Sequence, residues 1–170
     1  AGDAEVTIAC LGISQLIEGE EGESIASRHK GDREEIGLPQ NQIDFLKKIR
    51  SKAKKLVIVM TGGSAVACPE IFEMADAMLF VWYPGEQGGN AVGDVIFGDA
   101  SPSGRLPVTF PMALEDLPPY DSYDMTNRTY RYAEKAPLFP FGFGLSYTQF
   151  EYEDMKLSKA AIGIKEEVEV

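Results

Sequence analysis

A cluster of glutamates near the N-terminus is the part of this sequence best suited to chemistry. Glu18, Glu20, Glu21 and Glu23 lie within residues 16–23, and no lysine or arginine separates them. Crowded carboxylates raise one another's pKa, so one of them can stay protonated and act as a general acid. Hydrolysis of a glycosidic bond with retention needs such an acid about 5–5.5 Å from a nucleophilic carboxylate. From composition alone, a solvated acidic loop is the commoner interpretation of such a cluster.

Runs of apolar residues predict the strands of a sheet around this cluster. Glu5–Leu11 (EVTIACL) is rich in β-forming residues and nearly continuously apolar, and Leu56–Met60 and Ala77–Trp82 have the same character. Such runs are typical of buried strands in a parallel sheet. The acidic cluster follows the first of them, so we expect it on a loop beyond the end of that strand.

The segments between and after these strands predict helices. Leu38–Lys54 has Pro39 near its start, an amphipathic pattern and lysines toward its end, which suits the helix dipole. Ser64–Met74 and Asn90–Phe97 are expected to be helical as well. Strands that alternate with helices indicate an α/β fold, here a mostly parallel sheet covered by helices (an α/β sandwich).

Other segments depart from this alternation. Gly12–Gly37 is long, charged and without clear periodicity, and we expect it to be the least ordered internal segment. Leu106–Phe110 is flanked by prolines and is expected to form an edge strand, whereas Leu114–Ala136 is irregular. Phe150–Val170 alternates apolar and polar residues in places, as the opening strands of an all-β module do.

The composition disfavours several classes of function. The chain has 170 residues, enough for one domain, and its net charge of −11 argues against nucleic acid and anionic membranes as partners. No apolar run approaches the roughly 20 residues of a membrane span. Cys10 and Cys68 form no CxxC pair, and a single histidine cannot complete a metal site. We therefore expect two buried free thiols, or a disulfide if the two segments are neighbours, and no metal and no cofactor.

Four stretches of the chain carry a family resemblance. They are Trp82–Gly89 (WYPGEQGG), Phe97–Pro111 (FGDASPSGRLPVTFP), Tyr130–Tyr132 (YRY) and Pro137–Thr148 (PLFPFGFGLSYT). In this order and spacing they resemble the C-terminal half of family 3 glycoside hydrolases. Their glycines and prolines are typical of turns and close packing. Residues 85–89 lack the Lys and Ser/Thr of a phosphate-binding loop, which disfavours a nucleotide-binding domain.

The resemblance implies a domain organisation and an activity. Residues 1–149 would form the family's C-terminal α/β sandwich domain, and residues 150–170 the truncated start of a fibronectin type III-like β-sandwich. The intact enzyme, periplasmic or secreted, would be a retaining β-glucosidase or β-xylosidase that cleaves β-linked oligosaccharides or glycosides at their non-reducing ends. Its nucleophilic aspartate would lie in an N-terminal barrel domain of the same chain, so this part alone would be inactive. The alternative is a non-catalytic carbohydrate-binding or structural α/β module.

The resemblance also implies that the acid/base is a glutamate on the loop after the first strand. Counting from the strand end favours Glu18, and residues 17–20 resemble the Ile-Glu-Ala-Glu stretch of xylosidase-like members. Counting back from Gly31-Asp32-Arg33 favours Glu21, by analogy with glucosidase-like members. Glu20 and Glu23 stay open as further alternatives.

The other charged residues of this loop are expected to have supporting roles. Asp32 and Arg33 would fix the loop by ion pairing rather than act on substrate, and His29, the single histidine, would be exposed.

Overall fold

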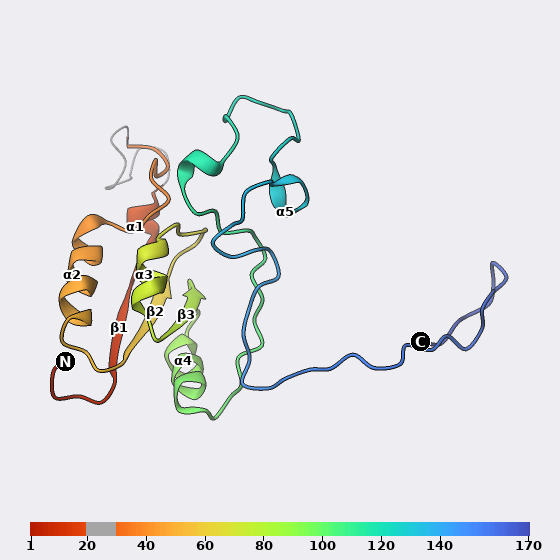
Figure 1. Ribbon diagram of the computed structural model, residues 1–170, viewed down its shortest axis with the longest axis horizontal. Coiled ribbons are helices and arrows are strands. Elements are labelled where there is room, and N and C mark those ends of the chain that lie inside the picture. Colours follow the sequence, from red (N-terminus) through yellow and green to blue (C-terminus); the bar gives the residue numbers. More distant parts are fainter. Residues whose placement is uncertain (20–29) are drawn as a thin grey trace.

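A three-stranded parallel sheet forms the centre of the computed structural model, which describes residues 1–19 and 30–170 (Figure 1). The strands are β1 (Thr7–Gly12), β2 (Leu56–Thr61) and β3 (Ala77–Trp82), and they lie in the order β1-β2-β3. All three were predicted from apolar runs, and the α/β fold with a parallel sheet is confirmed. Because both pairings are parallel, the carboxyl ends of the three strands meet at one edge of the sheet.

Short helices connect and follow the strands. They are α1 (Gln15–Glu18), α2 (Gln40–Arg50), α3 (Pro69–Met74), α4 (Gly88–Phe97), the 3-10 helix η1 (Leu114–Asp116) and α5 (Thr129–Tyr132). The helix α1 lies inside Gly12–Gly37, a segment whose sequence shows no clear periodicity, and the expectation that this segment is the least ordered one stays a prediction.

The helix α2 shows why the sequence folds in this way. Pro39 precedes its first turn, where a missing amide hydrogen costs nothing, and Lys47, Lys48 and Arg50 lie in its last turn near the negative end of the helix dipole. Its apolar residues Ile43 and Leu46 are buried against the sheet. The helix is shorter than predicted and ends before Ser51.

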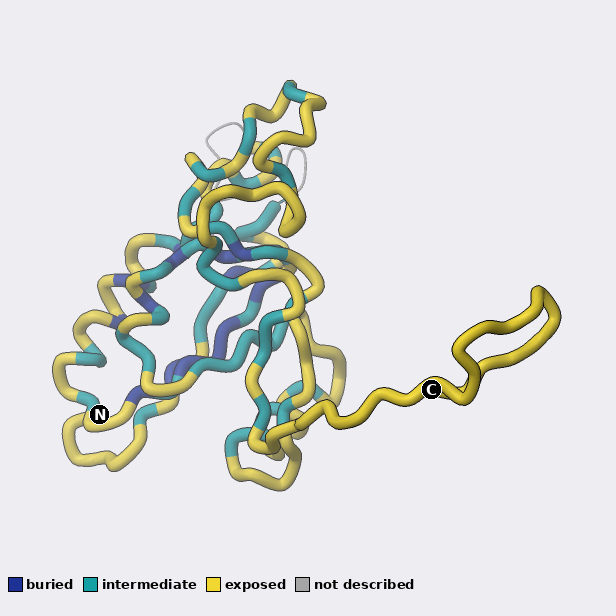
Figure 2. The backbone as a smooth tube through the Cα atoms, turned by 45° about the vertical axis from the view of Figure 1, so that its right-hand side comes forward, coloured by how far each residue is buried: buried dark blue, intermediate teal, exposed yellow. Residues whose placement is uncertain are grey.

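The main core lies on one face of the sheet. There, residues of α2 and α3 pack on alternate side chains of β1 and β2, and the cluster comprises Ala9, Ile13, Leu38, Ile43, Leu46, Leu56, Ile58, Met60, Val66, Cys68 and Ile71. Figure 2 shows the buried residues as dark blue stretches of the backbone, gathered in the α/β body. Strand alternation turns the neighbours of Ala9 to the other face, where Ile8 is 43% exposed and Cys10 is also exposed. The prediction of two buried thiols is therefore right for Cys68 and wrong for Cys10.

Two parts of the chain after α4, around Phe110 and around Phe139, pair with each other without forming a regular strand. Phe110 and Phe139 exchange two backbone hydrogen bonds of 2.8 and 3.2 Å in an isolated antiparallel bridge. The predicted edge strand Leu106–Phe110 is therefore not formed. Pro107 and Pro111 have no amide hydrogen to donate, which limits the ladder to this single bridge.

Aromatic side chains fasten this segment to the end of the sheet. The ring of Phe110, which is 1% exposed, contacts Phe80 and Trp82 of β3 edge-to-face at centroid distances of 5.2 and 6.2 Å. Phe139 in turn packs edge-to-face on Phe72 of α3 and stacks on Phe143. Phe110 belongs to one of the stretches that carry the family resemblance, and Phe139 and Phe143 belong to another.

Residues 150–170, all of which the structure describes, are exposed and form no helix or strand. They extend away from the α/β body and close in a loop, where the Ser158 amide donates to the Glu169 carbonyl at 2.9 Å (Figures 1 and 2). The fibronectin type III-like extension and the boundary at residue 149 stay predictions. In the described parts of the chain, no helix is long and apolar enough to cross a membrane.

Candidate active site

The carboxylate of Glu18 lies at the carboxyl edge of the sheet, where the three strands end. Glu18 is the last residue of α1, which follows β1 after a short turn. Ser64 comes shortly after β2, and Tyr83 directly follows β3. Clefts beyond the carboxyl ends of parallel strands are where open α/β sheets place their ligands.

Glu18 accepts hydrogen bonds from residues that follow the other two strands. The hydroxyl of Ser64 donates to its Oε1, and the hydroxyl of Tyr83 donates to its Oε2. The backbone amide of Gly63 also donates to Oε2, at 3.2 Å. Both oxygens of the carboxylate are therefore engaged by donors, an arrangement that favours the ionised form.

The backbone at the strand ends makes this convergence possible. A Cβ atom on Gly63 would lie 2.5 Å from Glu18 Oε2 and 2.6 Å from the Tyr83 ring, so only glycine lets the amide approach so closely. The pairing register of β2 with β3 shifts between Met60 and Thr61 of β2, and Thr61 lies opposite Trp82, the last residue of β3. Trp82 also adopts a φ of 55°. This irregularity turns the chain as a β-bulge does and directs Tyr83 toward Glu18.

Arg33 is hydrogen-bonded to Glu18 and to the segment that follows β2. Its backbone amide donates to the Glu18 carbonyl at 3.2 Å, and its Nη2 donates to Ser64 Oγ at 2.8 Å and to the Ala65 carbonyl at 2.5 Å. Its Nη1 is buried and has no hydrogen-bond partner among the described residues. Arg33 is thus held beside Glu18 by hydrogen bonds, whereas Asp32 is exposed. That these two residues fix the loop by ion pairing stays a prediction.

The surroundings shift the pKa values of these groups. Burial alone would raise the pKa of Glu18, but the hydrogen bonds from Ser64 and Tyr83, the Arg33 charge and the Gly63 amide outweigh it and lower that pKa. Burial and the adjacent carboxylate of Glu18 raise the pKa of Tyr83 to about 12. Burial lowers the pKa of Arg33, although the carboxylate of Glu18 opposes that effect. In this geometry Glu18 is an ionised carboxylate and Tyr83 a neutral donor.

Several residues named from the sequence lie outside the described part of the chain. They are Glu20, Glu21, Glu23 and His29. Sequence reasoning found Glu18 and Arg33 but missed Gly63, Ser64 and Tyr83. Their positions just beyond the second and third predicted strands were the signal that could have identified them.

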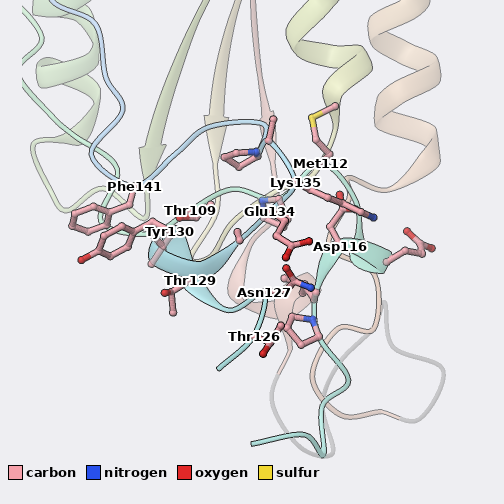
Figure 3. A pocket seen from close by; sticks show the side chains of 18 of the residues that line it. Thr109, Met112, Asp116, Thr126, Asn127, Thr129, Tyr130, Glu134, Lys135 and Phe141 are labelled. Carbon is pink, nitrogen blue, oxygen red and sulfur yellow. The ribbon is translucent and has the colours of Figure 1, made fainter. Parts of the chain in front are cut away.

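A hollow lies among the irregular segments of residues 107–141. It is an open cavity of about 780 Å³, lined among others by Asp116, Asn127, Glu134, and the stacked rings of Tyr130 and Phe141 (Figure 3). None of the residues that hold Glu18 lines it. No group of three metal-ligating side chains occurs in the described ranges 1–19 and 30–170.

The fold and the site together define a parallel α/β domain with the carboxylate of Glu18 at the carboxyl edge of its sheet. A family model described as the glycosyl hydrolase family 3 C-terminal domain matches residues 1–147. The chain belongs to this family.

Named relatives agree with this assignment. The chain is 45% identical over 164 residues to a xylan 1,4-beta-xylosidase of Xylanibacter ruminicola, with 96% of this chain and 19% of that protein covered. It is 38% identical to a periplasmic beta-glucosidase of Salmonella typhimurium, with 93% and 21% covered. The crystal structure of a family 3 β-glucosidase from Bifidobacterium adolescentis superposes with a TM-score of 0.77 at 32% identity, covering 94% of this chain and 24% of the other. The chain thus spans about a fifth of the length of the curated relatives it matches.

Proposed function

We propose that this chain is the part of a retaining β-glycosidase that supplies the acid/base carboxylate, from the loop between β1 and α2. The nucleophilic aspartate belongs to a barrel domain elsewhere in the same protein. Family membership supports the proposal, as do the names of the relatives, a β-xylosidase and a β-glucosidase. The observation that carries it is the position of Glu18, whose carboxylate lies beside the ends of all three strands at the base of a glutamate-rich loop.

The chemistry assigns two successive tasks to a carboxyl group of this loop. As a neutral acid it protonates the leaving glycosidic oxygen while the aspartate attacks the sugar and forms a glycosyl-enzyme. As a carboxylate it then removes a proton from the water that releases the sugar. Glu18 and Glu21 are the principal candidates, with Glu20 and Glu23 as alternatives.

The substrate we propose is a β-xyloside or β-glucoside, cleaved from the non-reducing end of an oligosaccharide. Sugars of this kind are neutral, so the net charge of −11 does not repel them. No cofactor takes part in the proposed reaction.

Replacing each loop glutamate by alanine in the intact enzyme tests the proposal. The variant that lacks the acid/base should lose about 10²–10⁴-fold in activity on natural substrates with poor leaving groups. It should lose far less on the first step with dinitrophenyl glycosides, which need no protonation, and azide should restore its turnover. If none of the four variants at positions 18, 20, 21 and 23 behaves in this way, the acid/base does not come from this loop.

A further inference from the structure

We infer that the hollow among residues 107–141 binds a sugar unit of the oligosaccharide substrate, in the part of the molecule that departs when the bond is cleaved. The inference rests on the proposed function, because it assumes that the whole protein cleaves a neutral β-linked oligosaccharide from its non-reducing end. An enzyme of that kind holds one terminal sugar and lets the rest of the substrate extend away. Only the departing part can therefore reach a second binding site.

The hollow lies at the end of the domain where the strands stop. Figure 1 shows η1, which belongs to its lining, at the end of the body where α1 lies. Thr109, another lining residue, precedes Phe110, whose ring packs on Trp82 at a centroid distance of 6.2 Å. Trp82 in turn precedes Tyr83, which donates to the Glu18 carboxylate. A substrate bound at the carboxyl edge of the sheet can thus extend toward the hollow.

Two aromatic rings give the hollow a flat apolar wall. Tyr130 and Phe141 stack with their ring centroids 4.9 Å apart and an interplanar angle of 19°, and the two residues are 61% and 50% exposed. Figure 3 shows these rings together on one side of the hollow. A pyranose sugar has an apolar face of C–H groups, and packing that face on an aromatic ring removes apolar surface of both from water. The half-open rings of Tyr130 and Phe141 suit this contact.

Free polar groups line the same hollow. Within residues 1–19 and 30–170, the side chains of Asn127 and Glu134 make no hydrogen bond or ion pair. An amide and a carboxylate together offer donors and acceptors, which the hydroxyls of a sugar require. Asp116 differs, because its Oδ1 accepts from Lys135 Nζ at 2.7 Å and its Oδ2 from the Ala113 amide at 3.2 Å. Asn127 and Glu134 are therefore the groups best placed to bind a ligand.

The charge of the lining favours a neutral ligand over an anionic one. Four carboxylates and one ammonium group line the hollow, which gives a net charge of −3; they belong to Glu115, Asp116, Asp124, Glu134 and Lys135. A phosphate or an acidic sugar would be repelled by this charge. A neutral sugar is not repelled, and its hydroxyls can donate hydrogen bonds to a carboxylate.

One wall of the hollow is held in place by the chain itself, as is usual for ligand sites, which are largely preformed. Arg128 donates hydrogen bonds to three backbone carbonyls of the segment before it, those of Pro119, Ser122 and Asp124. Thr129 adopts a φ of 59°, a conformation that is unfavourable for a β-branched residue. Backbone strain of this kind is concentrated where side chains must be fixed for binding.

Substrate length in the intact enzyme tests the inference. Tyr130→Ala should lower kcat/KM for a tetrasaccharide of β-linked xylose or glucose by about 10-fold, the size of effect expected when one aromatic contact is lost. The loss should appear in KM, because a contact remote from the cleaved bond binds ground state and transition state equally. A nitrophenyl monoglycoside has no sugar beyond that bond, so its kcat/KM should stay unchanged. Tyr120→Ala removes a fully exposed ring outside the hollow and is the matched control, which should leave both substrates unaffected.

Glu134→Ala keeps the inference testable if Tyr130→Ala does not fold, because Glu134 is exposed, and it should show the same dependence on length. Equal losses on the monoglycoside and the tetrasaccharide would overturn the inference and show that the hollow packs against another part of the protein. Unchanged kinetics of the variants would overturn it as well. In both cases the proposed function stands, whereas an unaltered enzyme that hydrolyses neither substrate would remove the proposed function itself.

Discussion

The backbone amide of Arg33 donates a hydrogen bond of 3.2 Å to the carbonyl of Glu18, so the residues at the two ends of the acidic loop are paired. The same two residues also share the hydroxyl of Ser64. Holding the two ends of a loop together removes the entropic cost of closing it.

Glu18→Gln should reduce the dependence of stability on pH. The folded chain lowers the pKa of Glu18 below its ordinary value of 4.5, so its carboxylate stabilises the fold above that pH. This contribution is lost as the pH falls through the lowered folded value. Because the site is partly open to solvent, we expect it to be under about 1 kcal/mol at pH 7.

Urea denaturation of both proteins between pH 7 and pH 3 measures this difference. Asp76, Asp116, Asp124 and Glu166 also have lowered pKa values, but they are common to both proteins and cancel in the comparison. The free-energy difference should shrink toward acid pH, and a difference that grows there would refute the assignment.

Gly12→Ala should destabilise the chain by more than about 1 kcal/mol, because its backbone conformation is unsuited to other residues. Gly12 has a φ of 140°, and a Cβ there would lie 2.1 Å from the Thr61 carbonyl oxygen. The substitution would also disturb Gln42, whose side chain bonds both the amide and the carbonyl of Gly12 at 3.0 and 2.8 Å. Gly2→Ala, with no atom within 4 Å of the added Cβ, is the control and should leave the urea midpoint unchanged.

The sheet could be predicted from the sequence because its strands are short apolar runs that need no knowledge of their neighbours. Ala77–Trp82 was predicted with its observed bounds, and β2 extends one residue beyond its predicted end at Met60. The edge strand Leu106–Phe110 failed because the prolines at its ends limit its pairing with the segment around Phe139 to one bridge, while Phe110 itself is held by an aromatic contact with Phe80 of β3. The exposure of Cys10 could not be read from a nearly continuous apolar run, since such a run does not say which face is covered.

The site was predictable only in part, for a similar reason. Glu18 and Arg33 belong to a loop whose charge marks it in the sequence. Ser64 and Tyr83 are ordinary turn residues until the parallel register sets the ends of β2 and β3 beside that loop. The shift in register at the end of the β2–β3 pairing and the positive φ of Trp82 then set the direction of Tyr83, and local propensity carries no signal for either.

Leu46→Ala should cost about 2–5 kcal/mol of unfolding free energy, the usual range for a buried leucine that leaves a cavity. Leu46 is 0% exposed and packs in the cluster between α2 and the sheet. Its neighbour Phe45 is 53% exposed, so Phe45→Ala is a control for the loss of helix side chains. Equal destabilisation of the two variants in urea would show that α2 does not pack on the sheet by this face.

The two cysteines should differ strongly in their reaction with a thiol reagent such as iodoacetamide. Cys10 is exposed on the open face of β1, whereas Cys68 is 4% exposed. Burial raises the pKa of the Cys68 thiol, and Glu70 adds to this effect, although the Leu38 amide that donates to its Sγ at 3.0 Å opposes it. Since the thiolate is the reactive form, Cys68 is both less accessible and less often ionised than an open thiol.

One equivalent of label should therefore enter the native chain, and a second should follow only in denaturant. Cys10→Ala should abolish the fast reaction and Cys68→Ala should leave it intact; fast labelling of Cys10→Ala would mean that the core around α3 opens readily.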